Sequence, residues 1–304
     1  MTTPGNHLTI RIVKNTKDID TFMFGEGCFM KNRTTVFKPI VGCVLLLCGL
    51  TLLALAQGSV PNYQGPETEK FLTEAKITGM KDIPIGVTRP RKATLELDGL
   101  SHFAAFKTID EKKSGVTQLD RGVEIEFQDS WRTEVAAYEL DKLIGLGMVP
   151  ATVQRMYDGK QGSMQYWLDY KMDEAERTKK KLSPPNPINW NQQVAKVRFW
   201  DNLIYNTDRN LGNLLITEDW KIRLIDHSRT FRPFNQLKDP KQLTTFSRTL
   251  LAKIEELNEP MLKEHLGKYL TPYQIQGLLK RRDAILELSK KLVAEKGAGA
   301  VLYQ

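Results

Sequence analysis

Asp208, Asn213 and Asp226 are the residues whose types and spacing most clearly indicate chemistry. Asp208 and Asn213 lie five positions apart in the run NTDRNLGNLLI, and Asp226 ends the next apolar run, IRLID. Phosphoryl transfer requires a carboxylate that orients the acceptor hydroxyl and oxygen ligands that hold a divalent cation on the phosphates. Two aspartates and one asparagine in this order can supply these groups, so the segment is a candidate site for phosphoryl transfer.

Short strands are expected on both sides of the candidate site. Residues 214–216 and 222–225 are apolar runs separated by a turn, which is the pattern of two paired strands. The chain before and after this pair is expected to be helical, over 190–204 and, with interruptions at two prolines, over 240–295. The back half of the sequence is therefore predicted to be mainly helical.

The front half of the sequence is expected to be rich in strands. Apolar and polar residues alternate at 94–97, 102–107 and 123–127, which predicts three strands, the first two joined at an Asp-Gly turn. An amphipathic helix that ends at a glycine is expected over 131–145, and another strand over 162–170. The sequence thus predicts an α+β protein.

The segment 206–226 resembles the catalytic core of the phosphatidylinositol 3- and 4-kinase superfamily, most closely the type II phosphatidylinositol 4-kinases. It is less similar to the secretory-pathway Fam20 kinases and the bacterial HipA-like kinases. In that superfamily a D-R-x-x-x-N loop and an I-D-x-x strand end carry the chemistry. The resemblance implies that Asp208 is the catalytic aspartate, that Arg209 organises the loop, and that Asn213 and Asp226 are metal ligands.

The resemblance extends upstream to AAFK, which ends at Lys107, and to EVAAY, which begins at Glu134. It implies that these two residues form an ion pair that positions the phosphates of ATP. It also implies Mg²⁺ or Mn²⁺ as the cation and a two-lobed protein-kinase-like fold, with a strand-rich N-lobe and a helix-rich C-lobe. The implied nucleotide contacts are Lys107, Arg89, Trp167, Leu168 and Leu215.

The sequence departs from the kinase pattern in four respects. Position 210 is Asn where many members of the superfamily have His. No G-x-G-x-x-G is present, so Arg89 or Arg91 would have to neutralise phosphate charge at the loop 86–90. Asp226 is followed by His-Ser rather than Phe-Gly, which argues against typical activation-loop switching. No basic motif of a lipid-kinase substrate loop follows, so lipid specificity does not carry over, and the hydroxyl acceptor could be a protein, a phosphoinositide or a small molecule.

The apolar run at 40–56 predicts the cellular localisation of the protein. Basic residues precede this run and none follows it before Lys70, which predicts that the body faces away from the cytoplasm. An Ala-x-Ala pattern at 54–56 fits a cleaved signal peptide, and the length also fits an uncleaved signal anchor. We expect a periplasmic, extracellular or lumenal protein, or one that is attached to a membrane through this segment.

Four regions are predicted along the chain. All three cysteines lie in the first fifty residues, so the folded part has no disulfide framework or cysteine zinc site available. With 41% hydrophobic and 26% charged residues, the rest has the composition of a globular protein. The regions are an N-terminal extension at 1–56, a linker with a short helix at 57–80, an N-lobe at 81–172 and a C-lobe at 173–304.

Two other functions fit parts of the sequence. An exported pseudokinase would keep the fold as a nucleotide-binding or scaffolding module, and scarce ATP outside the cytoplasm favours it. However, Lys107, Asp208 and Asp226 are all present. A net charge of +8 could suit nucleic acid, but no recognition motif accompanies it, so no nucleic-acid partner is expected.

Overall fold

The computed structural model describes residues 62–83, 90–119 and 122–304. Every described residue belongs to one compact unit of the chain. Among the described helices, none combines the length and apolar character needed to cross a bilayer.

Two of the sequence predictions lie outside the described residues. The apolar run at 40–56 and most of the loop at 86–90, including Arg89, belong to the segments that the structure does not describe. The signal peptide or anchor and the contribution of Arg89 therefore stay predictions.

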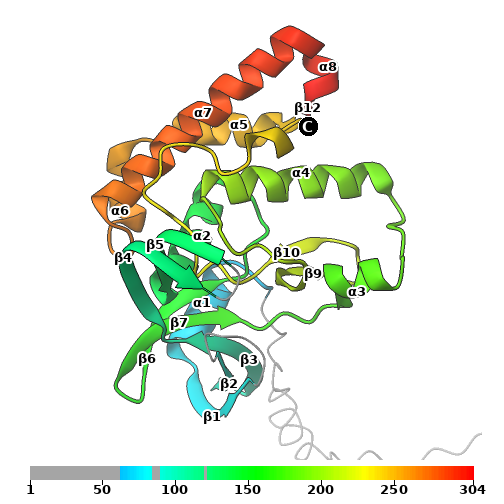
Figure 1. Ribbon diagram of the computed structural model, residues 1–304. Helices are drawn as coiled ribbons and strands as arrows, with labels where there is room; N and C mark the ends of the chain where they lie inside the picture. The colour runs from blue at the N-terminus through cyan, green and yellow to red at the C-terminus, as the bar shows by residue number, and fades with distance from the viewer. Residues whose placement is uncertain (1–61, 84–89, 120–121) are drawn as a thin grey trace, which may run out of the picture. The chain divides into compact units, whose positions relative to one another are not determined.

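A five-stranded antiparallel sheet forms the N-terminal part of the described unit, in the order β1-β2-β3-β7-β6 (Figure 1). Asp98 and Gly99 both have positive φ, as a two-residue hairpin turn between β2 and β3 requires. The strands are β1 Lys76–Asp82, β2 Arg91–Leu97, β3 Leu100–Lys107, β6 Thr152–Tyr157 and β7 Lys160–Tyr166.

Two helices pack beside this sheet. Helix α1, Pro66–Glu74, buries Phe71 and Leu72, and helix α2 runs over Trp131–Ile144. The Ser130 hydroxyl caps the first turn of α2, and Gly145 ends the helix in the left-handed conformation, as predicted.

A separate hairpin connects β3 to α2. Its strands are β4, Asp110–Leu119, and β5, Gly122–Ser130, and they pair only with each other. In Figure 1 this hairpin lies between the sheet and the C-terminal helices, and a hydrogen bond from Gln274 to Gln128 (Nε2–Oε1, 2.8 Å) joins it to them. The hairpin therefore touches both parts of the unit.

The C-terminal part of the unit is mainly helical, as predicted. Its helices are α3 Glu174–Lys179, α4 Pro187–Leu203, α5 Arg248–Glu256, α6 Glu259–Leu266, α7 Pro272–Lys296 and α8 Ala298–Val301. Three short strands form a small sheet at the junction, β8 Met172–Asp173, β9 Leu214–Ile216 and β10 Ile222–Leu224, and β11 Phe246–Ser247 pairs with β12 Leu302–Tyr303.

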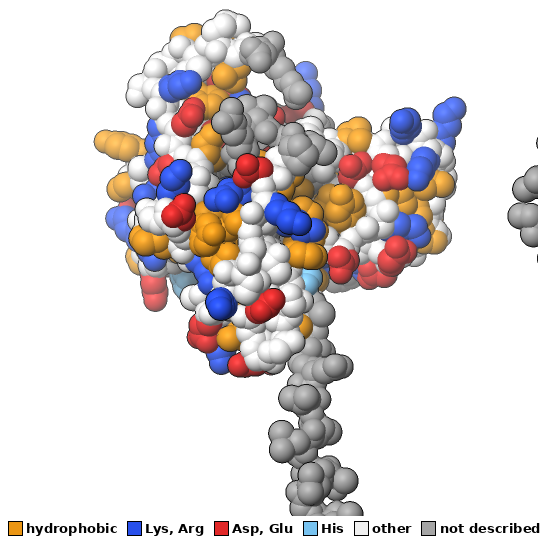
Figure 2. All heavy atoms as spheres, turned by 90° about the horizontal axis from the view of Figure 1, so that it is seen from below, with side chains coloured by type: hydrophobic (Ala, Val, Ile, Leu, Met, Phe, Trp, Pro, Cys, Tyr) orange, Lys and Arg blue, Asp and Glu red, His pale blue; other side chains and the backbone are white. Residues whose placement is uncertain are grey.

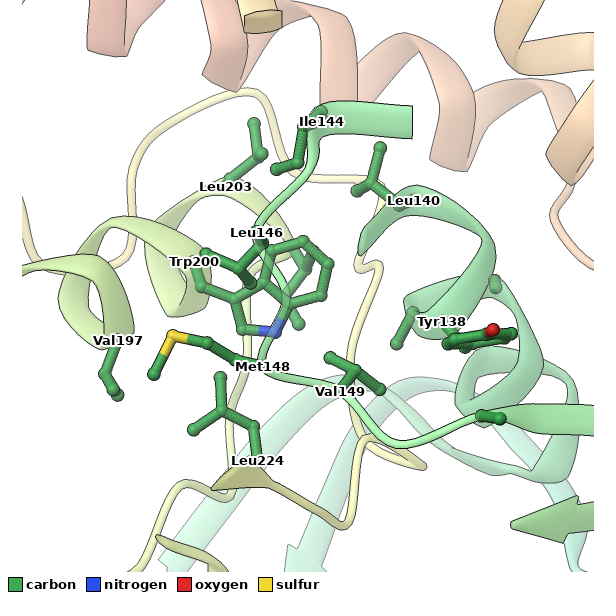
Figure 3. Packing of buried hydrophobic residues seen from close by; sticks show 14 of the residues in the cluster. Tyr138, Leu140, Ile144, Leu146, Met148, Val149, Val197, Trp200, Leu203 and Leu224 are labelled. Carbon is green, nitrogen blue, oxygen red and sulfur yellow. The ribbon is translucent and has the colours of Figure 1, made fainter. Parts of the chain in front are cut away.

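One hydrophobic core runs through the unit. Figure 3 shows Trp200 of α4 beside Leu146 and Met148, which follow α2, with Leu224 of β10 nearby. Trp200 is fully buried, and an aromatic side chain of this size dominates local packing energetics. The core therefore holds α2, α4 and the small sheet in a fixed arrangement, and these elements carry the candidate residues.

The strand predictions were incomplete. Strands β1, β4, β6, β8, β11 and β12 were not predicted, and the strand expected over 162–170 ends at Tyr166. Beyond that point the Trp167 N–H donates to the carbonyl of Phe103 (3.1 Å), and the chain leaves the ladder.

Charge is distributed over both signs on the surface. On the face shown in Figure 2, Lys and Arg side chains are intermixed with Asp and Glu and with hydrophobic groups. On this face the positive excess of the chain does not gather into one basic patch.

Candidate active site

Strand β3 presents Lys107 to the site. Ala104 and Phe106 are buried against the core, and the alternation of a strand places Phe103, Ala105 and Lys107 on the opposite face. Gly162 of β7 lies so close to β3 that an added Cβ would collide with the Lys107 carbonyl and the Phe106 ring. The glycine thus lets β7 approach the end of β3.

Lys107 lies between two carboxylates. Its Nζ is 2.5 Å from Glu134 Oε1 on α2 and 2.8 Å from Asp226 Oδ1, which follows β10. Glu134 is almost completely buried, and its Oε2 accepts the N–H of His227 at 3.0 Å. The structure therefore forms the Lys107–Glu134 contact that the resemblance implies and adds Asp226 to it.

The charges of Lys107 and Asp226 depend on each other. Burial opposes the charged form of Lys107, but the carboxylates of Asp226 and Glu134 outweigh it and raise the pKa of Lys107. Burial likewise opposes ionisation of Asp226, but the Lys107 ammonium prevails and lowers the pKa of Asp226 to about 2. Asp226 is therefore a carboxylate at neutral pH, the form that binds a divalent cation.

Asp226 has a backbone conformation that is unusual for aspartate. Its φ is 60°, in the left-handed region, where a residue with a side chain costs roughly 1–3 kcal/mol. Such strain persists where neighbouring contacts determine the conformation, and here the Glu134 carboxylate holds the following N–H. The conformation directs the Asp226 side chain toward Lys107.

Arg209 ties the loop that carries Asp208 to the rest of the site. Its guanidinium contacts the carboxylate of Asp201 on α4 through Nε and Nη2, at 3.0–3.1 Å, and its Nη1 donates to the Ile225 carbonyl at 2.9 Å. A bidentate arginine–carboxylate pair fixes geometry as well as charge. Arg209 thus joins α4, the loop and the residue that precedes Asp226.

Asn213 and Asp208 occupy the two ends of this loop. The Ile225 N–H donates to the Asn213 carbonyl at 3.2 Å, which places Asn213 beside the Asp226 segment. At the other end, the Asn206 side chain accepts the N–H of Asp208 at 2.9 Å. The loop therefore brings Asp208, Asn213 and Asp226 to one region.

Asp208 has a neighbour that the sequence did not indicate. Arg229 Nη1 is 3.5 Å from Asp208 Oδ2, and Arg229 Nη2 also contacts the Glu124 carboxylate of β5. Arg232 Nη2 contacts the second oxygen of Glu124. A charge network from the hairpin therefore reaches Asp208, and no local motif of the sequence marks it.

Trp167 begins the segment proposed to contact the nucleotide base. Both of its backbone polar groups are engaged, because its N–H donates to Phe103 and its carbonyl accepts from His102 Nε2 at 2.8 Å. Its ring lies near Lys92, whose Nζ is 4.2 Å from the ring centroid and 3.9 Å from that of Phe103. The N–H of Trp167 is thus already used, and its side chain and the second lone pair of its carbonyl are available to a base.

Leu168 and Leu215 are both buried, with Leu215 on β9. They belong to the same core as Ala104 and Met172 and lie at the junction of the two sheets. Their positions are compatible with an apolar wall for a base.

The fold is similar to that of solved kinases. Two crystal structures of the Golgi casein kinase match, one with a TM-score of 0.56 at 13% identity, covering 78% of this chain and 76% of that chain. The other, with Mn and ADP bound, has a TM-score of 0.55 at 14% identity and covers 78% of each chain. The Helicobacter pylori proinflammatory kinase CtkA gives 0.48 at 13% identity, over 74% of this chain and 98% of that chain.

No protein-family model and no curated protein matches the chain. The likeness to the Golgi casein kinase shows a kinase-like fold, with a strand-rich front and a helical back. The closer assignment to the phosphatidylinositol 3- and 4-kinase superfamily stays a prediction.

Proposed function

We propose that this protein is an ATP-dependent phosphotransferase that transfers the γ-phosphate of ATP to a hydroxyl group. The contact of Lys107 with Glu134 and Asp226, at 2.5 and 2.8 Å, carries the proposal. Phosphoryl-transfer sites use such a lysine–glutamate pair to position nucleotide phosphates, with an aspartate nearby for the cation. The Golgi casein kinase, which has the same fold, was solved with Mn and ADP.

The side chains fit a hard divalent cation. Asp226 and Asn213 supply a carboxylate and an amide oxygen, the donor types that Mg²⁺ and Mn²⁺ prefer. Within the part of the chain that the structure describes, no group of three or more His, Cys, Asp or Glu side chains is placed to hold a metal ion. A site with few protein ligands suits Mg²⁺, which usually takes its other ligands from phosphates and water.

The chain's own residues would act mainly by positioning and by charge. Lys107 would neutralise the phosphates, and Asp208 would orient the acceptor hydroxyl for in-line attack on the γ-phosphorus. The acceptor O–P bond forms as the bond to the β–γ bridging oxygen breaks, and the acceptor proton passes toward the Asp208 carboxylate. A bound Mg²⁺ or Mn²⁺ would neutralise charge that develops on the phosphate oxygens.

Export and the nature of the acceptor belong to the same proposal. The apolar run at 40–56 supports transport of the unit out of the cytoplasm, into a lumen or an outer compartment, with a membrane contact where the run is retained. The acceptor is a hydroxyl of a protein, a phosphoinositide or a small molecule.

The test is a transfer assay on the chain from Gln57 onward, with labelled ATP and Mg²⁺ or Mn²⁺. We expect label on the protein itself or on protein or lipid acceptors. Asp226→Ala and Asp208→Asn should each lower transfer by several orders of magnitude. Asp208→Asn should keep nucleotide binding, because Lys107 and Asp226 are intact.

Two other results would change this proposal. Normal transfer by the Asp226→Ala protein would refute the mechanism. Metal-dependent nucleotide binding without transfer to any acceptor would instead support a nucleotide-binding or scaffolding module.

A further inference from the structure

Asp129, next to the last residue of β5, has a buried carboxylate oxygen that no protein group satisfies. The residue is 5% exposed, and its Oδ1 has no hydrogen-bond partner. Leaving a buried carboxylate oxygen without a donor costs free energy. This oxygen is therefore available to bind a ligand that is not part of the protein.

The backbone places Asp129 beside the segment that follows Asp226. The Ser130 N–H donates to the Ser228 carbonyl at 2.9 Å, and the Thr133 hydroxyl donates to the same carbonyl at 2.9 Å. These two bonds join the end of β5 and the start of α2 to Ser228. The position of Asp129 is thus fixed by main-chain contacts.

Ser228 connects the two aspartates. Its Oγ donates to Asp226 Oδ1 at 3.3 Å. A hydroxyl has a single proton, so none is left for Asp129 Oδ1. Burial raises the pKa of Asp129, and the negative charge of Asp226 adds to this rise. Asp129 and Asp226 therefore lie within electrostatic range of each other.

The cations near Asp129 are already engaged. Lys107 contacts both Glu134 and Asp226, and Arg229 contacts Glu124 and Asp208. Asp129 forms no ion pair with a described residue, so its carboxylate lacks a cation of its own. A divalent cation would supply two positive charges and would take oxygen atoms from both aspartates.

We propose that Asp129 is a further ligand of the divalent cation, acting together with Asp226. The inference rests on the proposed function for the identity of the cation, Mg²⁺ or Mn²⁺, and names a donor from the hairpin that joins β3 to α2. The remaining coordination positions are left to Asn213, nucleotide phosphates and water.

The test measures Mn²⁺ binding by titration, with and without ADP, in wild type, Asp129→Asn and Asp129→Ala. The matched control is Glu111→Gln, because Glu111 lies on the same hairpin at an exposed position and contacts only Lys113 (3.9 Å). We expect both Asp129 variants to weaken Mn²⁺ binding about tenfold or more. The control should bind like wild type.

A thermal melt separates a ligand from a structural residue. If Asp129 had a structural role, its replacement would lower the melting temperature of the protein. We expect the metal-free Asp129→Asn protein to melt at or above the wild-type temperature, because it loses a buried, uncompensated charge. Its stabilisation by Mn²⁺ should shrink.

Wild-type Mn²⁺ affinity in both Asp129 variants would overturn the inference, as would a wild-type protein that binds no Mn²⁺. The ADP measurement tests the proposed function separately. Mn²⁺ binding that depends on Asp129 in a protein that binds no ADP would refute the proposed function and support the cation site.

Discussion

His227 is a buried base behind the candidate site. Its Nε2 accepts from Trp200 Nε1 at 3.1 Å and lies 3.2 Å from Arg209 Nη2. These donors leave the proton on Nδ1, which is 3.9 Å from Glu134 Oε2. The neutral imidazole therefore links α4 to the loop of Asp208. Protonation of Nε2 would break its contacts with Trp200 and Arg209.

His227 should give the folding stability a dependence on pH. Burial and the Arg209 charge lower the pKa of His227 well below its ordinary value. Below about pH 6.5 the unfolded chain binds a proton that the folded chain excludes. The free energy of unfolding should therefore fall with decreasing pH, by up to about 1.4 kcal/mol per pH unit.

Urea unfolding between about pH 7.5 and 5 would measure this slope. His227→Gln should flatten it, whereas His265→Gln, at an exposed position, should keep it. An unchanged slope in the His227→Gln protein would contradict the assignment.

Some site residues could be predicted from sequence and others could not. Asp208, Asn213 and Asp226 lie within one short segment, so their meeting depends on local structure. Arg229 and Glu124 are 105 positions apart. Their contact depends on the packing of a hairpin against a distant loop, and neither residue belongs to a local motif.

At the scale of elements, the β4–β5 hairpin was the hardest part of the fold to predict from the sequence. Strand β4 is almost wholly exposed, so it has no alternation of apolar and polar residues. A register shift between Lys113 and Val116 also breaks its pairing with β5. By contrast, β2 and β3 bury alternate residues, and this pattern predicted them correctly. Helix α2 was also predicted, although it is buried on most of its sides.

The hairpin should act on catalysis through Glu124. This carboxylate holds Arg229, which contacts Asp208 at 3.5 Å. We expect Glu124→Gln to lower kcat roughly tenfold, because loss of a charged hydrogen bond costs about 1.5–3 kcal/mol and only part of that would reach Asp208. The KM for ATP should change little, because Lys107 and Asp226 do not contact Glu124.

Steady-state kinetics would show this split between kcat and KM. Glu111→Gln, on the same hairpin at an exposed position, is the matched control and should behave like wild type. A wild-type kcat in the Glu124→Gln protein would show that the hairpin does not contribute to catalysis through Glu124.

At the scale of the whole described unit, the C-terminal helix α7 supports the site through its contact with the β4–β5 hairpin. Gln274 at its start donates to Gln128 of β5, whose amide in turn donates to the Thr230 carbonyl at 3.0 Å. The helix therefore contacts the hairpin directly and is linked through Gln128 to the segment after Asp226. The sequence predicted the helix from its periodicity, but it could not show which surface the helix covers.

Arg281 is the main polar link between α7 and the rest of the unit. It is fully buried, and its guanidinium donates to the carbonyls of Leu203 (2.8 Å), Arg232 (2.9 Å) and Phe234. Leu203 ends α4, and Arg232 holds Glu124. One planar group thus joins α7 to the end of α4 and to the segment 232–234.

Replacing Arg281 with lysine should therefore destabilise the whole unit. A lysine ammonium cannot reproduce the planar fork of donors, so at least one buried carbonyl would lose its partner. We expect Arg281→Lys to lower the free energy of unfolding by about 2–4 kcal/mol in urea titrations. Lys280→Gln, at the exposed neighbouring position, should stay within about 0.5 kcal/mol of wild type. Equal stability of the Arg281→Lys protein would mean that apolar packing alone holds α7 in place, and that the site does not depend on these three hydrogen bonds.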